Sequence, residues 1–307
     1  MREDLEDTAE LPGPPGGKGE PRPAAGASAL IHVEIAARTH PGRVREKNED
    51  HFLVVRFDRE MQTLLTNLPP GEVPEHYAET AYALLVADGV GGAAGGEVAS
   101  RIAIQALLDL VVETPDWIMR MDAPLAREVL ERLERRFQRV RQVLVERAQA
   151  DPSLKGMATT LTVAASIGRD LLTAHVGDSR AYLFRGGRLT RLTRDQTMAQ
   201  SLADAGAIPP EEVAKHPGRH VLTGALATRG AFAQVELGRT RLEDGDQVLV
   251  CSDGLTEMVS EETIGRVLRS ARSADEACRE LIDQALEGGG KDNITAVLGR
   301  YRIPSAI

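Results

Sequence analysis

Hydrophobic residues in this chain form two kinds of pattern, short continuous runs and repeats at steps of three and four. The first pattern predicts strands and the second predicts helices, and the two occur in separate blocks of the sequence. Short apolar runs bounded by Gly, Pro, Asn or Asp are typical of strands. They lie at residues 31–35, 51–55, 81–86, 161–165, 171–176, 181–185, 188–192, 235–237, 247–251 and 294–301. Apolar residues at steps of three and four predict helices at residues 98–107, 124–150, 198–205, 261–270 and 274–286. Hairpin-linked strands with helices grouped in pairs favour an α+β domain with antiparallel sheets.

Three segments need separate interpretation. Residues 1–28 are rich in Pro, Gly, Ala and charge, a composition that predicts a disordered tail before a single domain at 29–303. The connector at 59–80, broken by Pro69-Pro70-Gly71, is expected to be a surface loop. The charged run at 131–136 is interpreted as the solvated face of its helix, with a helical dimer seam as the alternative.

Composition narrows the class of protein. The chain has 307 residues, of which 42% are hydrophobic, enough for a sizeable core. Its net charge of −9 argues against a nucleic-acid partner or an anionic membrane. No apolar run approaches the ~20 residues of a membrane span, and the first residues lack the order of a signal peptide. The two cysteines, Cys251 and Cys278, lack metal or redox spacing, which predicts reduced core residues of a cytoplasmic protein.

Four short acidic clusters carry the chemistry. They are Asn48-Glu49-Asp50, Asp88-Gly89, Asp253-Gly254 and Asp292-Asn293. Each adjoins a strand-like run, so its carboxylate is expected at a strand end, facing a shared cleft. Any one alone is most simply a turn signal. Gathered carboxylates need a counter-charge, and oxygen ligands without Cys or His suit Mg²⁺ or Mn²⁺ and argue against zinc.

Six motifs in order resemble the metal-dependent protein Ser/Thr phosphatases (type 2C, or PPM), in particular the bacterial type. They are the segments Gly42 to Asp50, Val86 to Gly92, Gly156-Met157-Ala158-Thr159-Thr160, His175 to Arg180, Cys251 to Leu255 and Lys291 to Thr295. The resemblance runs from about residue 36 to 302. It implies two packed antiparallel β-sheets flanked by helix pairs, an α-β-β-α sandwich, with a metal cleft at one edge.

The resemblance also implies an activity and its partners. Members hydrolyse phosphoserine and phosphothreonine in proteins by direct attack of a water that bridges two Mn²⁺ or Mg²⁺ ions, ~3.5–4 Å apart. Phosphorylated proteins are therefore the expected partners, and a cytoplasmic Ser/Thr kinase the enzyme that this protein would oppose. Residues 201–230 correspond to the family's mobile flap over the cleft.

Site roles follow from the resemblance residue by residue. Asp88 would bridge both metal ions, and the Gly89 carbonyl would bind one of them. Asp253 and Asp292 would complete the other ion's shell. Glu49 and Asp50 would hold metal-bound waters in place.

Arg45 occupies the position that clamps the substrate phosphate in the family, so Arg45 and Asp88 are the expected catalytic residues. A guanidinium suits bidentate contact with phosphoryl oxygens, and the alternative is a surface salt bridge to a nearby acid. Asp178 and Ser179 are interpreted as structural turn residues rather than catalytic ones.

Two departures from the family pattern affect the expected mechanism. Some members carry a His directly after the Asp-Gly pair as a candidate acid for the leaving group, whereas Val90 stands there in this chain. His40 is a substitute acid or, more simply, a structural residue, and a metal-bound water is the other proton source. Lys155 stands where bacterial relatives place an aspartate for a third ion, which puts that site in doubt unless Asp151 reaches across.

Two alternatives to a general phosphatase remain open at this point. A pseudophosphatase would bind phosphoproteins without turnover; Lys155 is its only support. A narrow signalling enzyme would dephosphorylate one regulatory antagonist protein, and the absence of an attached sensor domain weakens that interpretation.

Overall fold

The computed structural model describes residues 31–69, 71–90, 95–113, 123–230 and 232–304. The disordered tail expected at 1–28 lies outside this part of the chain. No helix in the described residues is long and apolar enough to cross a bilayer.

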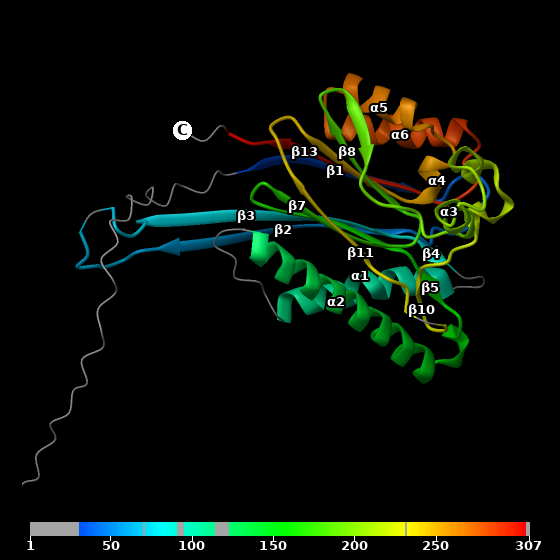
Figure 1. Ribbon diagram of the computed structural model, residues 1–307, viewed down its shortest axis with the longest axis horizontal. Coiled ribbons are helices and arrows are strands. Elements are labelled where there is room, and N and C mark those ends of the chain that lie inside the picture. The colour runs from blue at the N-terminus through cyan, green and yellow to red at the C-terminus, as the bar shows by residue number, and fades with distance from the viewer. Residues whose placement is uncertain (1–30, 70, 91–94, 114–122, 231, 305–307) are drawn as a thin grey trace, which may run out of the picture.

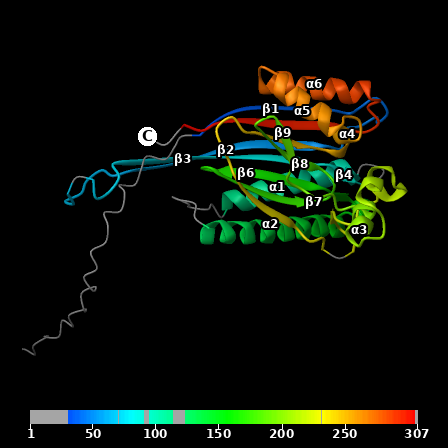
Figure 2. The same ribbon diagram turned by 45° about the horizontal axis from the view of Figure 1, so that its top comes forward.

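Two five-stranded sheets, antiparallel throughout, pack face to face (Figures 1 and 2). The first runs β1 (His32–His40), β13 (Ile294–Arg302), β12 (Gln247–Cys251), β8 (Arg180–Arg185), β9 (Arg188–Arg191). The second runs β11 (Glu236–Arg241), β7 (Asp170–Val176), β6 (Leu161–Ile167), β3 (His76–Ala87), β2 (His51–Gln62). A small third sheet joins β10 (Leu226–Ala227), β5 (Ala158–Thr159) and β4 (Gly89–Val90).

Helix pairs cover the two outer faces (Figure 1). Helices α1 (Gly95–Glu113) and α2 (Ala123–Ala150) pack on the second sheet, and α5 (Glu261–Ser270) and α6 (Ala274–Glu287) on the first. Two short helices, α3 (Met198–Asp204) and α4 (Asp253–Thr256), and three 3₁₀ turns, η1 (Pro152–Leu154), η2 (Pro210–Lys215) and η3 (Pro217–His220), complete the fold. The predicted α-β-β-α sandwich is confirmed.

The central strands are apolar on both faces because each face meets a different core. In β3, Leu84 and Val86 pack between the sheets, while Leu85 and Ala87 face α1 and α2. Successive side chains of a strand point to opposite faces. Such a strand therefore reads as a continuous apolar run that ends abruptly where the chain leaves the sandwich, and Asp88 stands at that end.

The surface loop expected at 59–80 is shorter than predicted. Its two ends belong to strands β2 and β3, which form a ribbon and pair from His51↔Ala87 to Gln62↔His76, so the connection between the strands is limited to residues 63–75. The ribbon projects beyond the body of the molecule (Figures 1 and 2). Strand propensity gives little signal there, because the strand ends at 59–62 and 76–79 consist mostly of charged and polar residues without a regular alternation of apolar positions.

Candidate metal and phosphate site

The four acidic clusters meet at one end of the sandwich, as their positions at strand ends predicted. Asp88 follows β3 and Asp253 follows β12, while Asp50 and Asn293 stand directly before β2 and β13. They border a cleft of about 760 Å³. Its lining includes Arg45, Glu49, Asp88, Gly89, Asp178, Asp253 and Asp292.

Glycines allow these clusters to approach one another closely. A Cβ on Gly89 would lie 2.3 Å from the backbone of Gly96 in the first turn of α1. A Cβ on Gly254 would lie 2.1 Å from the Asn293 carbonyl oxygen. Only glycine fits where two backbones pack this tightly, so the Asp-Gly pairs hold the clusters in contact as well as turning the chain.

Two threonines fix the backbone of Asp88. The Asp88 amide donates to Thr160 Oγ1 at 3.0 Å, and the Thr160 amide donates back to the Asp88 carbonyl at 2.9 Å. The Thr159 hydroxyl donates to the same carbonyl at 2.8 Å. The Thr159-Thr160 motif of the sequence therefore orients the predicted bridging carboxylate.

Asp50 is buried, with its side chain held by two hydroxyls. Ser252 Oγ and Thr295 Oγ1 donate to its Oδ2 at 2.6 and 2.7 Å. Its buried Oδ1 has no hydrogen-bond partner within the described chain. Burial raises the pKa of Asp50 to about 6. A buried carboxylate oxygen left without a donor is costly, and a water or cation in the cleft would satisfy it.

Carboxylates around the cleft raise one another's pKa. Burial, followed by the charges of neighbouring acids, holds the pKa of Asp88 and of Asp253 well above the ordinary value. Burial and the nearby Asp195 raise the pKa of Asp178 to about 7. Crowded acids with an unpartnered oxygen fit divalent cations that prefer oxygen ligands. The residues present therefore suit Mn²⁺ or Mg²⁺.

Arg45 lies at the mouth of this cleft and donates from Nη2 to Asp292 Oδ2 at 2.6 Å. Asn293 holds the loop that carries Arg45: its Nδ2 donates to the carbonyls of Pro41 and Lys47 at 2.9 and 2.8 Å. Its Oδ1 accepts from the Glu49 amide at 2.8 Å. The Asn of the Lys-Asp-Asn motif is thus a positioning residue that sequence reasoning left without a role.

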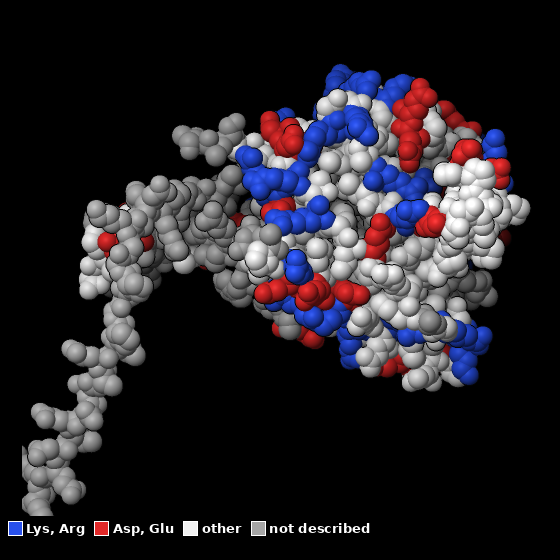
Figure 3. Space-filling view, viewed as in Figure 1, with Lys and Arg blue, Asp and Glu red and all other residues white. Residues whose placement is uncertain are grey.

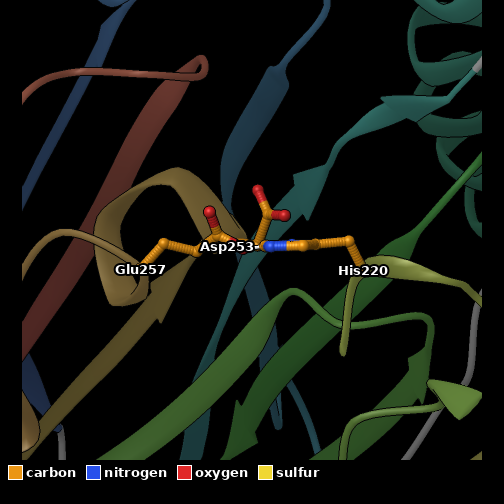
Figure 4. A group of neighbouring side chains, drawn as sticks. All are labelled: His220, Asp253 and Glu257. Atoms are coloured by element: carbon orange, nitrogen blue, oxygen red, sulfur yellow. Dashed lines mark ion pairs between the residues drawn. The ribbon is translucent and has the colours of Figure 1, made fainter. Parts of the chain in front are cut away.

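His220 and Glu257 are cleft residues that sequence reasoning missed. His220, at the end of η3 and within the segment 201–230 that was expected to form a flap, makes an ion pair through Nδ1 with Glu257 Oε1, next to Asp253 (Figure 4). One ligand atom from each of the three lies within 4.8 Å of the others, a spacing that could hold a metal ion. The i,i+4 spacing of Asp253 and Glu257 was the only available signal, because a lone His in a long loop gives none.

The structure also places the residues at which the sequence departs from the family pattern, Val90 and Lys155, and their suggested substitutes, His40 and Asp151. Val90 borders the cleft. His40 Nδ1 accepts from the Gly42 amide at 2.9 Å, which fits its structural interpretation. Asp151 accepts from the amide and hydroxyl of Ser153 at 3.0 and 2.7 Å and so caps its own turn. Lys155 is exposed at the end of that turn, and third-ion occupancy stays a prediction.

Several known proteins resemble this chain in both sequence and fold. The sequence model of the family described as protein phosphatase 2C matches residues 75–298. Serine/threonine protein phosphatase PstP of Mycobacterium tuberculosis H37Rv is 36% identical over 272 residues, 89% of this chain and 46% of that protein. The chain thus spans about half the length of that relative. Serine/threonine phosphatase stp of Listeria welshimeri is 34% identical over 268 residues, 87% of this chain and 95% of that protein.

A solved structure extends the likeness to three dimensions. The catalytic domain of PstP, crystallised in complex with two manganese ions, matches with a TM-score of 0.68 and 33% identity. The match covers 89% of this chain and 99% of that one. Sequence, ordered motifs and architecture agree, and the chain belongs to the protein phosphatase 2C family.

Proposed function

We propose that this protein hydrolyses phosphoserine and phosphothreonine in other proteins with the help of two divalent ions, Mn²⁺ or Mg²⁺. The observation that carries the proposal is the meeting of four acidic clusters in one cleft, where an oxygen of the buried Asp50 carboxylate lacks a donor. The relatives' names, serine/threonine phosphatases, agree with it.

The ions would be held by carboxylates from three strand ends. Asp88, the Gly89 carbonyl oxygen, Asp253 and Asp292 would supply the oxygen ligands. Glu49 and Asp50 would accept hydrogen bonds from waters beside those ligands and orient them. When bound, a pair of divalent ions neutralises phosphoryl charge and lowers the pKa of water enough to make it a nucleophile at neutral pH.

Arg45 supplies the contact to substrate. Its loop is fixed by Asn293, and its guanidinium already meets a carboxylate oxygen of Asp292. The same planar fork can instead donate to two phosphoryl oxygens. Arg45 therefore orients the phosphoryl group over the acids that hold the ions. The physiological role that fits this chemistry is opposition to a cytoplasmic Ser/Thr kinase.

A pseudophosphatase is the second candidate, because Lys155 departs from the bacterial pattern. The presence of Asp88, Asp253 and Asp292 in one cleft argues against it. The test is phosphate release from a phosphothreonine peptide with Mn²⁺, with Mg²⁺ and with a chelator. Turnover that needs the metal, and that Asp253→Asn abolishes, supports the enzyme. Peptide binding without release at any metal concentration would establish the pseudophosphatase.

A further inference from the structure

The loop from β1 to β2 and the loop from α6 to β13 lie side by side and form one wall of the cleft. The Arg43 amide donates to the Gly290 carbonyl at 2.7 Å, and Asn293 Nδ2 donates to the Lys47 carbonyl at 2.8 Å. These hydrogen bonds hold the two loops together. Side chains from both loops can therefore act on a single ligand in the cleft.

Lysines from both loops line this wall without a partner of their own. Among the described lining residues, the lysines and arginines are Arg45, Lys47 and Lys291. The Arg45 guanidinium meets Asp292. Lys47 and Lys291 are exposed, and within the described residues neither ammonium forms a hydrogen bond or an ion pair. Two ammonium groups in one wall of the cleft are thus available to a ligand.

Positive charge gathers on this side of the cleft. Across from it, η3 and α4 contribute His220 and Glu257, which pair with each other, and Leu222 adds apolar surface. Glu46, next to Lys47 in the sequence, also lines the cleft and offsets one of the two lysine charges. The wall formed by the two loops nevertheless keeps an excess of positive charge.

This basic wall differs from the wider distribution of charge. On the face shown in Figure 3, positive and negative side chains are interspersed, and the whole chain has a net charge of −9. Such a chain repels an acidic partner at long range, but fixed charges within a Debye length, about 10 Å at 0.1 M salt, decide what binds beside them. With divalent ions balancing the acids of the cleft, an anion next to the reacting phosphate meets the two lysines.

We propose that Lys47 and Lys291 form a subsite for an anionic side chain of the substrate. Preferred substrates would then carry an acidic residue, or a second phosphorylated residue, close to the phosphothreonine or phosphoserine that is hydrolysed. The inference rests on the proposed function. Carboxylate and phosphoryl oxygens share the chemistry that an ammonium binds as a point charge. Arg45 in the same wall takes the reacting phosphoryl group, which leaves the lysines for the neighbouring residue.

Three phosphothreonine peptides test the subsite. They differ only in the residues flanking the phosphothreonine on either side, which are glutamate, glutamine or phosphoserine. At saturating Mn²⁺, kcat/KM for release at the threonine is expected to be about three- to tenfold higher with glutamate than with glutamine, and the advantage should shrink as salt is added. An advantage with phosphoserine alone would identify the ligand as a second phosphate. No advantage for either anionic peptide would overturn the proposal.

Variants assign that preference to the lysines. Lys47→Met/Lys291→Met removes both charges and keeps the aliphatic stems, so it is expected to lose the preference while hydrolysing the glutamine peptide as wild type does. Lys47→Arg/Lys291→Arg is expected to keep the preference. The matched control is Lys215→Met, which removes an exposed lysine of η2 that does not line the cleft and is expected to keep it too. Equal losses on all three peptides would place the lysines on the reacting phosphate and overturn the subsite.

Peptide binding separates the subsite from the proposed function. The affinity of the metal-loaded protein for fluorescent forms of the glutamate and glutamine peptides is measured by anisotropy, alongside phosphate release. Tighter binding of the glutamate peptide without release at any metal concentration would support the subsite and contradict the proposed function. Release from both peptides with equal affinity and equal kcat/KM would support the function and overturn the subsite.

Discussion

The Arg45 guanidinium donates to the Asp292 carboxylate, with Nη2 2.6 Å from Oδ2. The pair joins two loops 247 residues apart and connects the proposed phosphate contact to a proposed metal ligand. This hydrogen bond and the charge of Asp292 raise the pKa of Arg45. The pair is largely exposed, so it contributes little to stability, and the two residues can be tested separately through their effects on substrate and on metal.

Arg45→Ala is expected to raise KM for a phosphopeptide much more than it changes metal affinity. The lost contact is a charge-assisted hydrogen bond to phosphate, worth about 1.5–3 kcal/mol, or roughly a tenfold to hundredfold change in KM. Arg45→Lys is the matched control and should recover only part of the loss, because an ammonium lacks the bidentate fork. Steady-state kinetics and manganese titrations distinguish the outcomes. Weaker metal binding with unchanged KM would make Arg45 a structural partner of Asp292.

Thiol alkylation is expected to leave turnover intact. Cys251 and Cys278 are both buried, and burial raises the pKa of each thiol to about 12. The thiolate is the reactive form, so neither residue can serve as nucleophile near neutral pH. Activity is to be measured after iodoacetamide treatment, with mass spectrometry to count modified thiols. Loss of turnover in native, metal-loaded protein would contradict the direct-water mechanism.

Removal of metal is expected to make stability fall as pH rises. Asp253 has a folded-state pKa well above its ordinary value, so it retains protons on folding that the unfolded chain has released. Its ionisation therefore destabilises the ion-free protein progressively from about pH 4 upward. Mn²⁺ offsets that cost, so the Tm gain from Mn²⁺ is expected to be larger at pH 8 than at pH 6.

The variant Asp253→Asn separates the contribution of Asp253 to the pH dependence of stability from that of groups with the opposite effect. Burial lowers the pKa of His175 to about 4, so His175 makes stability rise with pH up to about pH 6.5. His175 is present in both proteins, so its contribution cancels when the Tm of wild type is subtracted from the Tm of the variant. Without metal, Asp253→Asn is expected to be the more stable protein at pH 8, with an advantage that shrinks towards pH 5. A variant less stable than wild type at pH 8 would contradict the mutual repulsion of the cleft acids.

Much of this fold could be predicted from the sequence, because the acidic residues of the site lie directly next to the ends of the apolar strands. The boundaries of α5 at 261–270 match the prediction, since Ser260 caps the helix through its hydroxyl. The roles of Asp88, Asp253 and Asp292 stay predictions, yet their convergence follows from apolar runs that have an acid next to one end. Two features could not be predicted. The β2–β3 ribbon is held by cross-strand pairing rather than by pattern, and His220 reaches Glu257 only through the path of the flap.

His220→Ala is expected to affect large substrates more than small ones. His220 ties the flap to α4 through Glu257, and it borders the cleft together with Leu222. Loss of the tether frees a surface that a phosphopeptide would contact and an aryl phosphate would not. KM for the peptide is therefore expected to rise several-fold, with kcat/KM for the aryl ester almost unchanged. Equal losses for both substrates would place His220 in the chemistry or in metal binding instead.

Gly96→Ala is expected to damage the site although alanine favours a helix. Its Cβ would lie 2.5 Å from Glu49 Oε2 and 2.8 Å from the backbone of Gly89, so both must shift. The matched control is Gly265→Ala in α5, whose Cβ meets only Leu189 and Phe184, at 3.8 and 3.9 Å. That control is expected to gain about 0.5–1 kcal/mol of stability with normal activity. Gly96→Ala is expected to bind Mn²⁺ more weakly and to lose most turnover, by titration and kinetics. If both variants behaved alike, the close approach of α1 to Gly89 would have no part in forming the metal site.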